Sequence, residues 1–421
     1  MFLIALLTVF VQADTDRPFS ILGFTGVAGE ILMNPLTGSS LFFWQYNSQN
    51  GNITTDTRPL VIWTQGGPGC ASELGMLAEG ISPIYIDDSG NPQPSSSTWI
   101  TRVHLLAIDF PYGAGFSYAS QYTDAMNTSF TATNYLYSFL QTLGSKYPTW
   151  FQRDVYWFGE DYSGRFVPEI AATILHNNQI QGNIVIKLKG IALGDPWLDA
   201  QYQTQYYDMS AFYMSLVNPQ QQSILASAEQ NIYNQIQAGN FSTAYSLFQL
   251  MLGQFESFSD NVDIYDTRTY TMPSFSGLSS FLNSNTTKSM LGVPLGSTWQ
   301  ICNPSVKAAF GNDSMLNLTS TFIPYLLGQM KVMIYHGEDD MYCNTPGLSH
   351  FLKSLNWPYI QNFMASRRGT WSVMNNIAGY AQTYSNLTYI QVLDAGNQVG
   401  VKQPYALRDL AFRFIFNQGW N

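Results

Sequence analysis

The sequence predicts an α/β protein with a mostly parallel central sheet, helices on both faces and a helical insertion. Short, nearly uninterrupted apolar runs end in loops rich in glycine and proline, as in strands that are buried on both faces of a sheet. Helical patterns separate these runs, which is typical of β-α-β units. The predicted strands lie in six segments: 60–69, 103–115, 155–164, 184–195 with its core at 188–193, 331–340 and 388–396.

Three helical patterns accompany these strands. One spans about 130–146, one follows the third strand within VPEIAATIL, and the last is PYALRDLAFRFIF near the C-terminus. In sheets of this kind ligands bind beyond the carboxyl ends of the strands. The loops that follow the strands are therefore the first place to look for chemistry.

The segment from about 200 to 325 interrupts the alternation of strands and helices. Apolar residues recur there every four positions, at Ile224, Ala228, Ile232 and Ile236. This period predicts helices. We interpret the segment as a helical cap inserted into one large domain that covers residues 14–421.

The composition argues against several classes of partner. Of the 421 residues, 45% are hydrophobic and only 11% are charged, against about 25% in an average soluble protein. The net charge is −10 and there is no run of lysine or arginine, whereas phosphate binding requires clustered basic residues. Nucleic acids and anionic membrane surfaces are therefore not expected as partners.

The first 13 residues, MFLIALLTVFVQA, form an apolar segment that is too short to span a bilayer. Val11 and Ala13 fit the small-residue pattern before a cleavage site, so residues 1–13 are predicted to be a signal peptide. The alternative is a buried N-terminal strand. No later stretch is long and apolar enough for a membrane span. The chain is thus expected in the secretory pathway, either outside the cell or in a lysosome or vacuole.

Sequons and cysteines agree with that location. Seven Asn-x-Ser/Thr sequons occur, at Asn52, Asn127, Asn240, Asn285, Asn312, Asn317 and Asn386. The cysteines are Cys70, Cys302 and Cys343, and an odd number in an oxidising compartment predicts one disulfide and one free thiol. Their spacing leaves the pairing open.

The motif GEDYSG at residues 159–164 has the form of a nucleophile elbow, the sharp strand-to-helix turn that presents the nucleophile of an α/β hydrolase. Gly159 and Ser163 are the small residues two positions before and after the nucleophile. The nucleophile's own position holds Asp161. The motif therefore predicts the α/β-hydrolase fold with a changed reactive residue.

An acidic residue and then a histidine should follow the nucleophile in chain order. The loop after the strand at 331–340 supplies Asp339 and Asp340. The loop after the last strand supplies Asn397 where the histidine is expected. A serine nucleophile needs a base to take its proton, and an asparagine amide offers none.

Six motifs, in the same order, resemble those of the serine carboxypeptidase family. They are WTQGGPGCASELGMLAEG, IDFPYGAGFSY, GEDYSGRFVPEIA, GIALGDPWLD, GEDDMYCN and DAGNQVGVKQP, and they cover nearly the whole mature chain. The resemblance implies a catalytic serine, aspartate and histidine at the positions of Asp161, Asp340 and Asn397. Only the aspartate is retained. The sequence is therefore similar to a carboxypeptidase but is expected to lack peptidase activity.

The resemblance also implies binding groups. The backbone N–H groups of Gly67 and Tyr162 would form the oxyanion hole, and we expect the Asp161 carboxylate to turn toward them. Asn397 is expected to donate a hydrogen bond to Asp161 or Asp340. The same resemblance implies that Cys70 pairs with Cys302 and that the remaining cysteine is free. No cofactor or metal is expected.

Gln65, Glu79 and Glu160 match the group that holds a peptide's C-terminal carboxylate in the family. Two adjacent carboxyls raise the pKa of one of them, and the protonated carboxyl can donate to another carboxylate. These residues predict a binding or scaffolding protein. Its expected partners are peptide or protein C-termini, active relatives, or a second copy in a homodimer.

Three alternatives remain open at this point. The first is an active carboxypeptidase at acidic pH, with Ser163 as nucleophile or His336 as base. The second is an acyltransferase, which would also need a serine and a base. The third is a metal site at Asp161, Asp340 and Glu160, although no His/Cys ligand spacing supports it.

Overall fold

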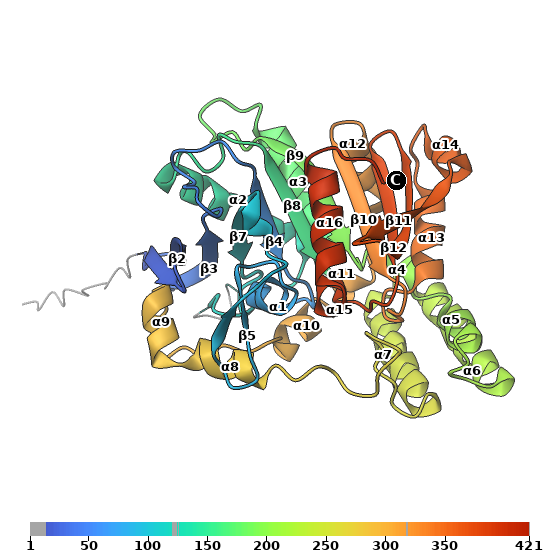
Figure 1. The fold of residues 1–421 in the computed structure, drawn as a ribbon. Helices are drawn as coiled ribbons and strands as arrows, with labels where there is room; N and C mark the ends of the chain where they lie inside the picture. Colours follow the sequence, from blue (N-terminus) through green and yellow to red (C-terminus); the bar gives the residue numbers. More distant parts are fainter. Residues whose placement is uncertain (1–13, 120–123, 125, 317–318, 421) are drawn as a thin grey trace, which may run out of the picture.

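The computed structural model describes residues 14–119, 124, 126–316 and 319–420 (Figure 1). The predicted signal peptide lies outside the described residues. Eleven strands form one twisted sheet in the order β1-β2-β3-β7-β4-β8-β9-β10-β13-β12-β11. A separate pair, β5 (Ile84–Ile86) and β6 (Pro92–Pro94), lies apart from it.

The six predicted strand segments form the parallel centre of this sheet. All five neighbouring pairs within it run parallel. The strands are β7 (His104–Ile108), β4 (Leu60–Thr64), β8 (Val155–Glu160), β9 (Leu188–Gly194), β10 (Lys331–Gly337) and β13 (Leu387–Val392). The observed strands are shorter than the predicted segments, because the glycine- and proline-rich ends of the segments form the loops that carry the site.

The antiparallel flanks of the sheet were not predicted. They pair through hairpins and need no intervening helix, so they lack the change of hydrophobic period that marks a β-α-β unit. They are β1 (Arg17–Ile21), β2 (Phe24–Asn34), β3 (Ser39–Tyr46), β11 (Arg368–Val373) and β12 (Asn376–Tyr384).

Alternate residues of the central strands feed two cores on opposite faces of the sheet. In β4, Ile62 packs into one hydrophobic core, while its neighbours Val61 and Trp63 pack into the other. The first core lies under α2 (Ser129–Lys146), α3 (Ser163–Asn177), α12 (Thr319–Leu327) and α13 (Thr345–Ser354). The second lies under α1 (Ser72–Ala78), α15 (Val399–Lys402) and α16 (Pro404–Ile415).

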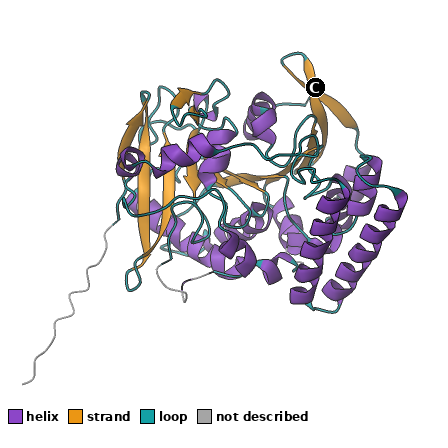
Figure 2. Cartoon of the chain, turned by 90° about the horizontal axis from the view of Figure 1, so that it is seen from below, coloured by secondary structure: helices purple, strands orange, loops and turns teal. Residues whose placement is uncertain are grey.

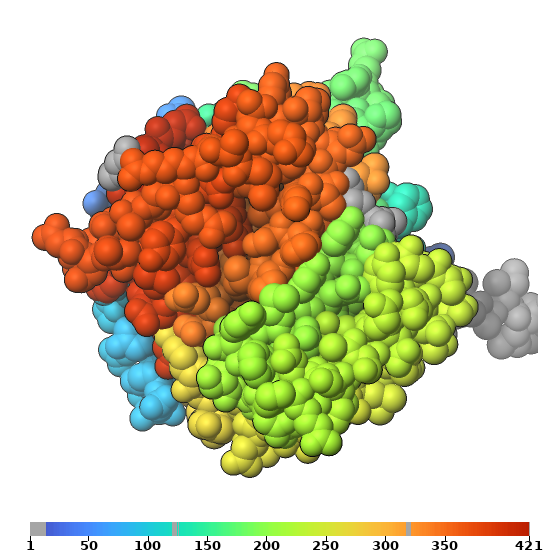
Figure 3. Space-filling view, turned by 90° about the vertical axis from the view of Figure 1, so that its right-hand side faces the viewer, coloured from blue at the N-terminus to red at the C-terminus, as the bar shows by residue number. Residues whose placement is uncertain are grey.

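The chain between β9 and β10 contains helices only, in the described residues, as expected for the insertion. The two longest of these helices, α6 (Pro219–Gln237) and α7 (Phe241–Phe258), project beyond the sheet when the molecule is seen from below (Figure 2). Their surface adjoins that of the C-terminal segments (Figure 3). The helices are α4 (Ala200–Gln203), α5 (Tyr207–Tyr213), α6, α7, α8 (Ser276–Asn283), α9 (Asn285–Leu291), α10 (Pro304–Ala309), α11 (Gly311–Ser314) and α12.

The buried face of α6 differs in detail from the prediction. Ile232 and Ile236 are buried, but Ile224 is 39% exposed and Leu225 is buried in its place. An α-helix repeats every 3.6 residues, so a strict four-residue period drifts off the buried face within a few turns. The predicted helix is correct and its buried register is shifted by one residue at the N-terminal end.

The insertion is not a single cap. After α7 the chain crosses the lower part of the view in Figure 1 and forms α8 and α9 beside β5 and β1, before it returns through α10. The short helix η1 (Trp99–Thr101) and α14 (Ile360–Ala365) complete the described elements. No helix in the described part of the chain is long and apolar enough to cross a membrane.

Candidate active site

The predicted elbow is present. Asp161 lies between the end of β8 and the start of α3 with a φ of 52°, a left-handed conformation that aspartate tolerates better than most residues. A side chain at Gly159 would bring its Cβ to 2.6 Å from Val167 Cγ2 and 2.8 Å from Ser163 Cβ. The turn is therefore too tight for a larger residue at that position.

The Asp161 carboxylate faces the loop after β4. Gly67 N–H donates to Asp161 Oδ2 over 2.5 Å. Burial raises the pKa of Asp161, while the positive charge of Lys307 and the N–H groups of Tyr162 and Gly67 lower it. The carboxylate is thus turned toward the Gly67 N–H, one of the two expected donors. By resemblance to the family, this N–H would belong to the oxyanion hole.

Asp340 and Asn397 also lie together. Asn397 Nδ2 donates to Asp340 Oδ2 over 3.0 Å, which is one of the two expected partners. The N–H groups of Tyr342 and Cys343 donate to Asp340 Oδ1. Burial raises the pKa of Asp340 to about 7, and the charge of Asp161 adds to that rise, while the hydrogen bonds oppose it. The Asp340 carboxyl is therefore held by the Asn397 amide and two backbone N–H groups.

The neighbouring Asp339 has a different environment. Its Oδ2 lies 3.1 Å from Arg268 Nε in an ion pair, and its side chain is partly exposed. Position 340 is therefore the one that the loop after β10 directs into the site.

His336 does not replace the missing base. Its Nε2 lies 3.0 Å from the carbonyl oxygen of Cys343, so Nε2 carries the proton, because a carbonyl only accepts. Its Nδ1 lies 3.2 Å from Thr345 Oγ1. Burial lowers the pKa of His336 to about 4. The ring is a neutral, hydrogen-bonded part of the core.

The same histidine belongs to the buried trio Asp195, His336 and Asp340, which could offer three ligand atoms within 4.8 Å of one another. The imidazole atom that faces the two carboxyls is His336 Nε2, which lies 3.8 Å from Asp195 Oδ1 and 3.9 Å from Asp340 Oδ2. This nitrogen bears the proton that is donated to the carbonyl oxygen of Cys343, so it has no free lone pair for a metal. The chemistry of the donor set does not fit a metal. The alternative site at Asp161, Asp340 and Glu160 contains no nitrogen or sulfur ligand.

Ser163 is not placed as a nucleophile. It begins α3, is completely buried and donates its hydroxyl to the carbonyl oxygen of Gln65 over 3.0 Å. Its side chain thus ties the elbow to the loop after β4. In the same loop, a Cβ at Gly66 would lie 2.2 Å from Tyr162 N, so the two segments approach as closely as glycine permits.

The structure brings Gln65, Glu79 and Glu160 together. Gln65 Nε2 donates to Glu160 Oε2 over 2.7 Å, and Gly400 N–H donates to Glu79 Oε2 over 2.9 Å. Burial raises the pKa of Glu79 to about 7. Burial and the charge of Glu79 raise that of Glu160 well above its usual range.

The two Oε1 atoms of this pair are buried and have no hydrogen-bond partner among the described residues. Two ionised carboxylates cannot bond to each other, but one shared proton lets the carboxyl of Glu79 or Glu160 donate to the other. The pair therefore holds one proton at pH values where an ordinary glutamate has lost it.

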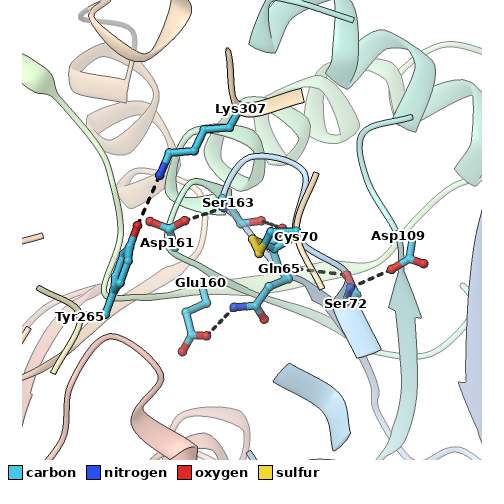
Figure 4. The surroundings of a disulfide bond; sticks show 11 residues. Gln65, Cys70, Ser72, Asp109, Glu160, Asp161, Ser163, Tyr265 and Lys307 are labelled. Atoms are coloured by element: carbon cyan, nitrogen blue, oxygen red, sulfur yellow. Dashed lines mark hydrogen bonds between the residues drawn. A yellow bond between two sulfur atoms is a disulfide. The ribbon is translucent and has the colours of Figure 1, made fainter. Parts of the chain in front are cut away.

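Lys307 and Tyr265 were missed by the sequence reasoning. Lys307 Nζ donates to Tyr265 OH over 3.3 Å and lies 5.3 Å from the centre of the Tyr342 ring (Figure 4). The only hint in the sequence is that Lys307 follows Cys302 by five residues. No pattern in the sequence marks Tyr265 as a site residue, because its position depends on the path of the insertion.

Backbone hydrogen bonds also join the insertion to the site. Asn397 N–H donates to the carbonyl oxygen of Tyr265 over 2.7 Å, and the N–H groups of Met341 and Tyr342 donate to that of Ile264. Beside these contacts lies a cavity of about 420 Å³. Its lining includes Asp263, Tyr265, Asp266, Met272, Asn397 and Lys402.

The cysteines form the expected disulfide. Cys70 and Cys302 are bonded, and Cys343 is a buried free thiol. Backbone hydrogen bonds on either side, from Ala71 N–H to Ile301 O and from Asn303 N–H to Gly69 O, hold α10 against the loop after β4. The disulfide thereby fixes Lys307 near the elbow.

The parallel sheet, the helices on both faces, and the elbow after β8 define an α/β-hydrolase fold. The sequence matches the serine carboxypeptidase family over residues 18–417, and the chain belongs to that family. The family prediction is therefore confirmed.

Two relatives from Dictyostelium discoideum illustrate the match. A probable serine carboxypeptidase CPVL is 31% identical over 414 residues, covering 96% of this chain and 80% of the relative. Serine carboxypeptidase S10 family member 1 is 29% identical and covers 93% and 94%. Kex1 from Saccharomyces cerevisiae, a prohormone-processing carboxypeptidase, superposes with a TM-score of 0.82 at 22% identity, covering 93% of this chain and 91% of Kex1. The last similarity supports the fold.

Proposed function

We propose that this protein binds the C-terminal carboxylate of peptides or protein chains without hydrolysing them, as a pseudoenzyme of the serine carboxypeptidase family. The observation that carries the proposal is the position of Asp161. Its carboxylate stands at the elbow and accepts the Gly67 N–H, while Asn397 is bonded to Asp340. The site has neither a serine hydroxyl to attack a carbonyl nor an imidazole to take its proton.

A reaction through Asp161 meets two obstacles. A carboxylate that attacks a peptide carbonyl forms an anhydride, which the departing amine readily reverses. Hydrolysis of any ester at Asp161 would need a base to activate water, and Asn397 cannot act as one. An acyltransferase fails for the same reason. The rearranged peptidase finds no support, because Ser163 and His336 are both engaged in structural hydrogen bonds.

Binding is supported by the carboxyl pair. When both carboxyls are protonated, one proton joins Glu79 to Glu160 and the second can be donated to a ligand carboxylate. Acidic pH favours this doubly protonated form, and burial extends it upward by raising both pKa values. An acidic compartment of the secretory pathway, or an acidic extracellular space, suits this site. The Cys70–Cys302 disulfide agrees with that pathway.

The test combines turnover with binding. A dipeptide with a blocked N-terminus is incubated with the secreted protein from pH 4.5 to pH 7.5, and released amino acid is quantified by chromatography. Binding of the dipeptide and of its C-terminal amide is measured by calorimetry under the same conditions. We expect no release, binding of the dipeptide, and no binding of the amide. Turnover, or equal binding of dipeptide and amide, would refute the proposal.

A further inference from the structure

The charge of Asp161 lacks a close counter-ion. None of the ion pairs formed by the described residues includes Asp161. Lys307 acts on it at longer range, but the Lys307 ammonium is directed to Tyr265 OH and the ring of Tyr342. The nearby Asp340 carboxyl adds negative charge. The Asp161 carboxylate is therefore free to form an ion pair with a cationic group of a ligand.

Asp161 directly follows Glu160, one member of the buried carboxyl pair. Figure 4 shows the Asp161 carboxylate on the side of Tyr265 and Lys307, and the Glu160 carboxyl bonded to the Gln65 amide. The pair with Glu79 is suited to a ligand carboxylate, whereas Asp161 repels one. A ligand that satisfies both groups must carry a carboxylate and a cation, and it must be short, because Glu160 and Asp161 are adjacent residues.

A peptide meets this demand poorly. The nitrogen of its C-terminal residue is an uncharged amide, and the carbonyl oxygen before it would point at the Gly67 N–H. That N–H is already used by Asp161. A bound peptide would thus place an acceptor against a carboxylate. A free α-amino acid carries an ammonium on the same carbon as its carboxylate, and ammonium groups are hydrogen-bond donors only.

We infer that this site binds free α-amino acids more tightly than peptides, with the carboxylate on the Glu79–Glu160 pair and the ammonium on Asp161. The inference rests on the proposed function, since it uses the same carboxylate-binding pair and names the class of molecule that fits best. A cavity of about 420 Å³ is lined by Tyr265 and Asn397, which bond to Lys307 and Asp340 respectively.

The test compares three forms of the same amino acids by calorimetry at pH 6. The probes are L-phenylalanine, L-leucine and L-arginine, each as the free amino acid, the N-acetyl derivative and the C-terminal amide. A charge-assisted hydrogen bond contributes enough that loss of the ammonium should weaken binding about tenfold to a hundredfold. We expect free amino acids to bind, N-acetyl derivatives to bind more weakly by that factor, and amides not to bind.

The variant Asp161→Asn provides the matched comparison. It should weaken binding of the free amino acid about tenfold or more and leave the N-acetyl derivative unchanged or tighter. N-acetyl forms that bind the intact protein as tightly as free amino acids would overturn this inference and leave the proposed function standing. Amides that bind as well as free amino acids, or a failure of all nine probes to bind, would overturn both. The comparison among probes needs no variant, so it holds even if Asp161→Asn does not fold.

Discussion

Replacing Glu79 by glutamine isolates the charge of the buried carboxyl pair. Glutamine keeps the shape of the side chain, its oxygen can still accept the Gly400 N–H, and its amide can donate to Glu160 in place of the shared proton. Burial raises the pKa of Glu79 from 4.5 to about 7. Because one pKa unit corresponds to about 1.4 kcal/mol, keeping this group ionised costs the folded state about 3 kcal/mol.

Proton linkage determines how the free energy of unfolding changes with pH. The folded chain binds the Glu79 proton more tightly than the unfolded chain does, so its stabilising effect is complete below pH 4.5 and is lost as the pH rises through about 7. Glu79→Gln has no such loss. We expect the variant and the wild type to have similar free energies of unfolding at pH 4.5. At pH 8 the variant should be more stable by about 3 kcal/mol, or about 3 °C in Tm for a chain of this length.

Thermal melts at pH 4.5 and pH 8 measure this difference at one scan rate. The matched control is Glu256→Gln, at an exposed position in the last turn of α7. It should leave the pH dependence of the melting temperature unchanged. A Glu79→Gln variant whose melting temperature differs from that of the wild type by the same amount at both pH values would refute the reasoning about the shared proton.

Two further variants test how the site is held. Joint replacement of Cys70 and Cys302 by alanine removes a cross-link over a sequence separation of 232 residues, for which chain entropy gives at most about 5 kcal/mol. Calorimetry should show a drop of several degrees in Tm, and an unchanged Tm would contradict the role of the disulfide. Lys307→Met should raise the pKa of Asp161 further, since it removes a charge that lowers it. Infrared titration of carboxyl groups should show this shift, and an identical titration curve would contradict it.

The elbow and the parallel strands could be predicted because their signals are local. Glycine and serine around Asp161 mark a tight turn, and each buried strand is one apolar run. The flanking hairpins were not predicted, because no helix separates their strands and the hydrophobic period therefore does not change between them. The position of α6 was predicted and its buried register was not, since Leu225 rather than Ile224 faces the core.

The residues that surround Asp161 could not be predicted from the sequence. Tyr265 and Lys307 come from the insertion, where no motif marks them, and they reach the elbow through backbone contacts and a disulfide. The partner of Asn397 was open between two carboxylates, and the structure places its amide on Asp340. Long-range placement of this kind depends on the path of the whole chain rather than on any one segment.

Fluorophosphonate labelling with peptide mapping tests most directly the claim that the site has lost its nucleophile and base. The wild type is compared with the double variant Asp161→Ser/Asn397→His, in which both groups are restored. We predict no label on the wild type and a label at position 161 of the double variant. A label on Ser163, or on another serine of the wild type, would show that the site still contains an activated nucleophile and would contradict the account.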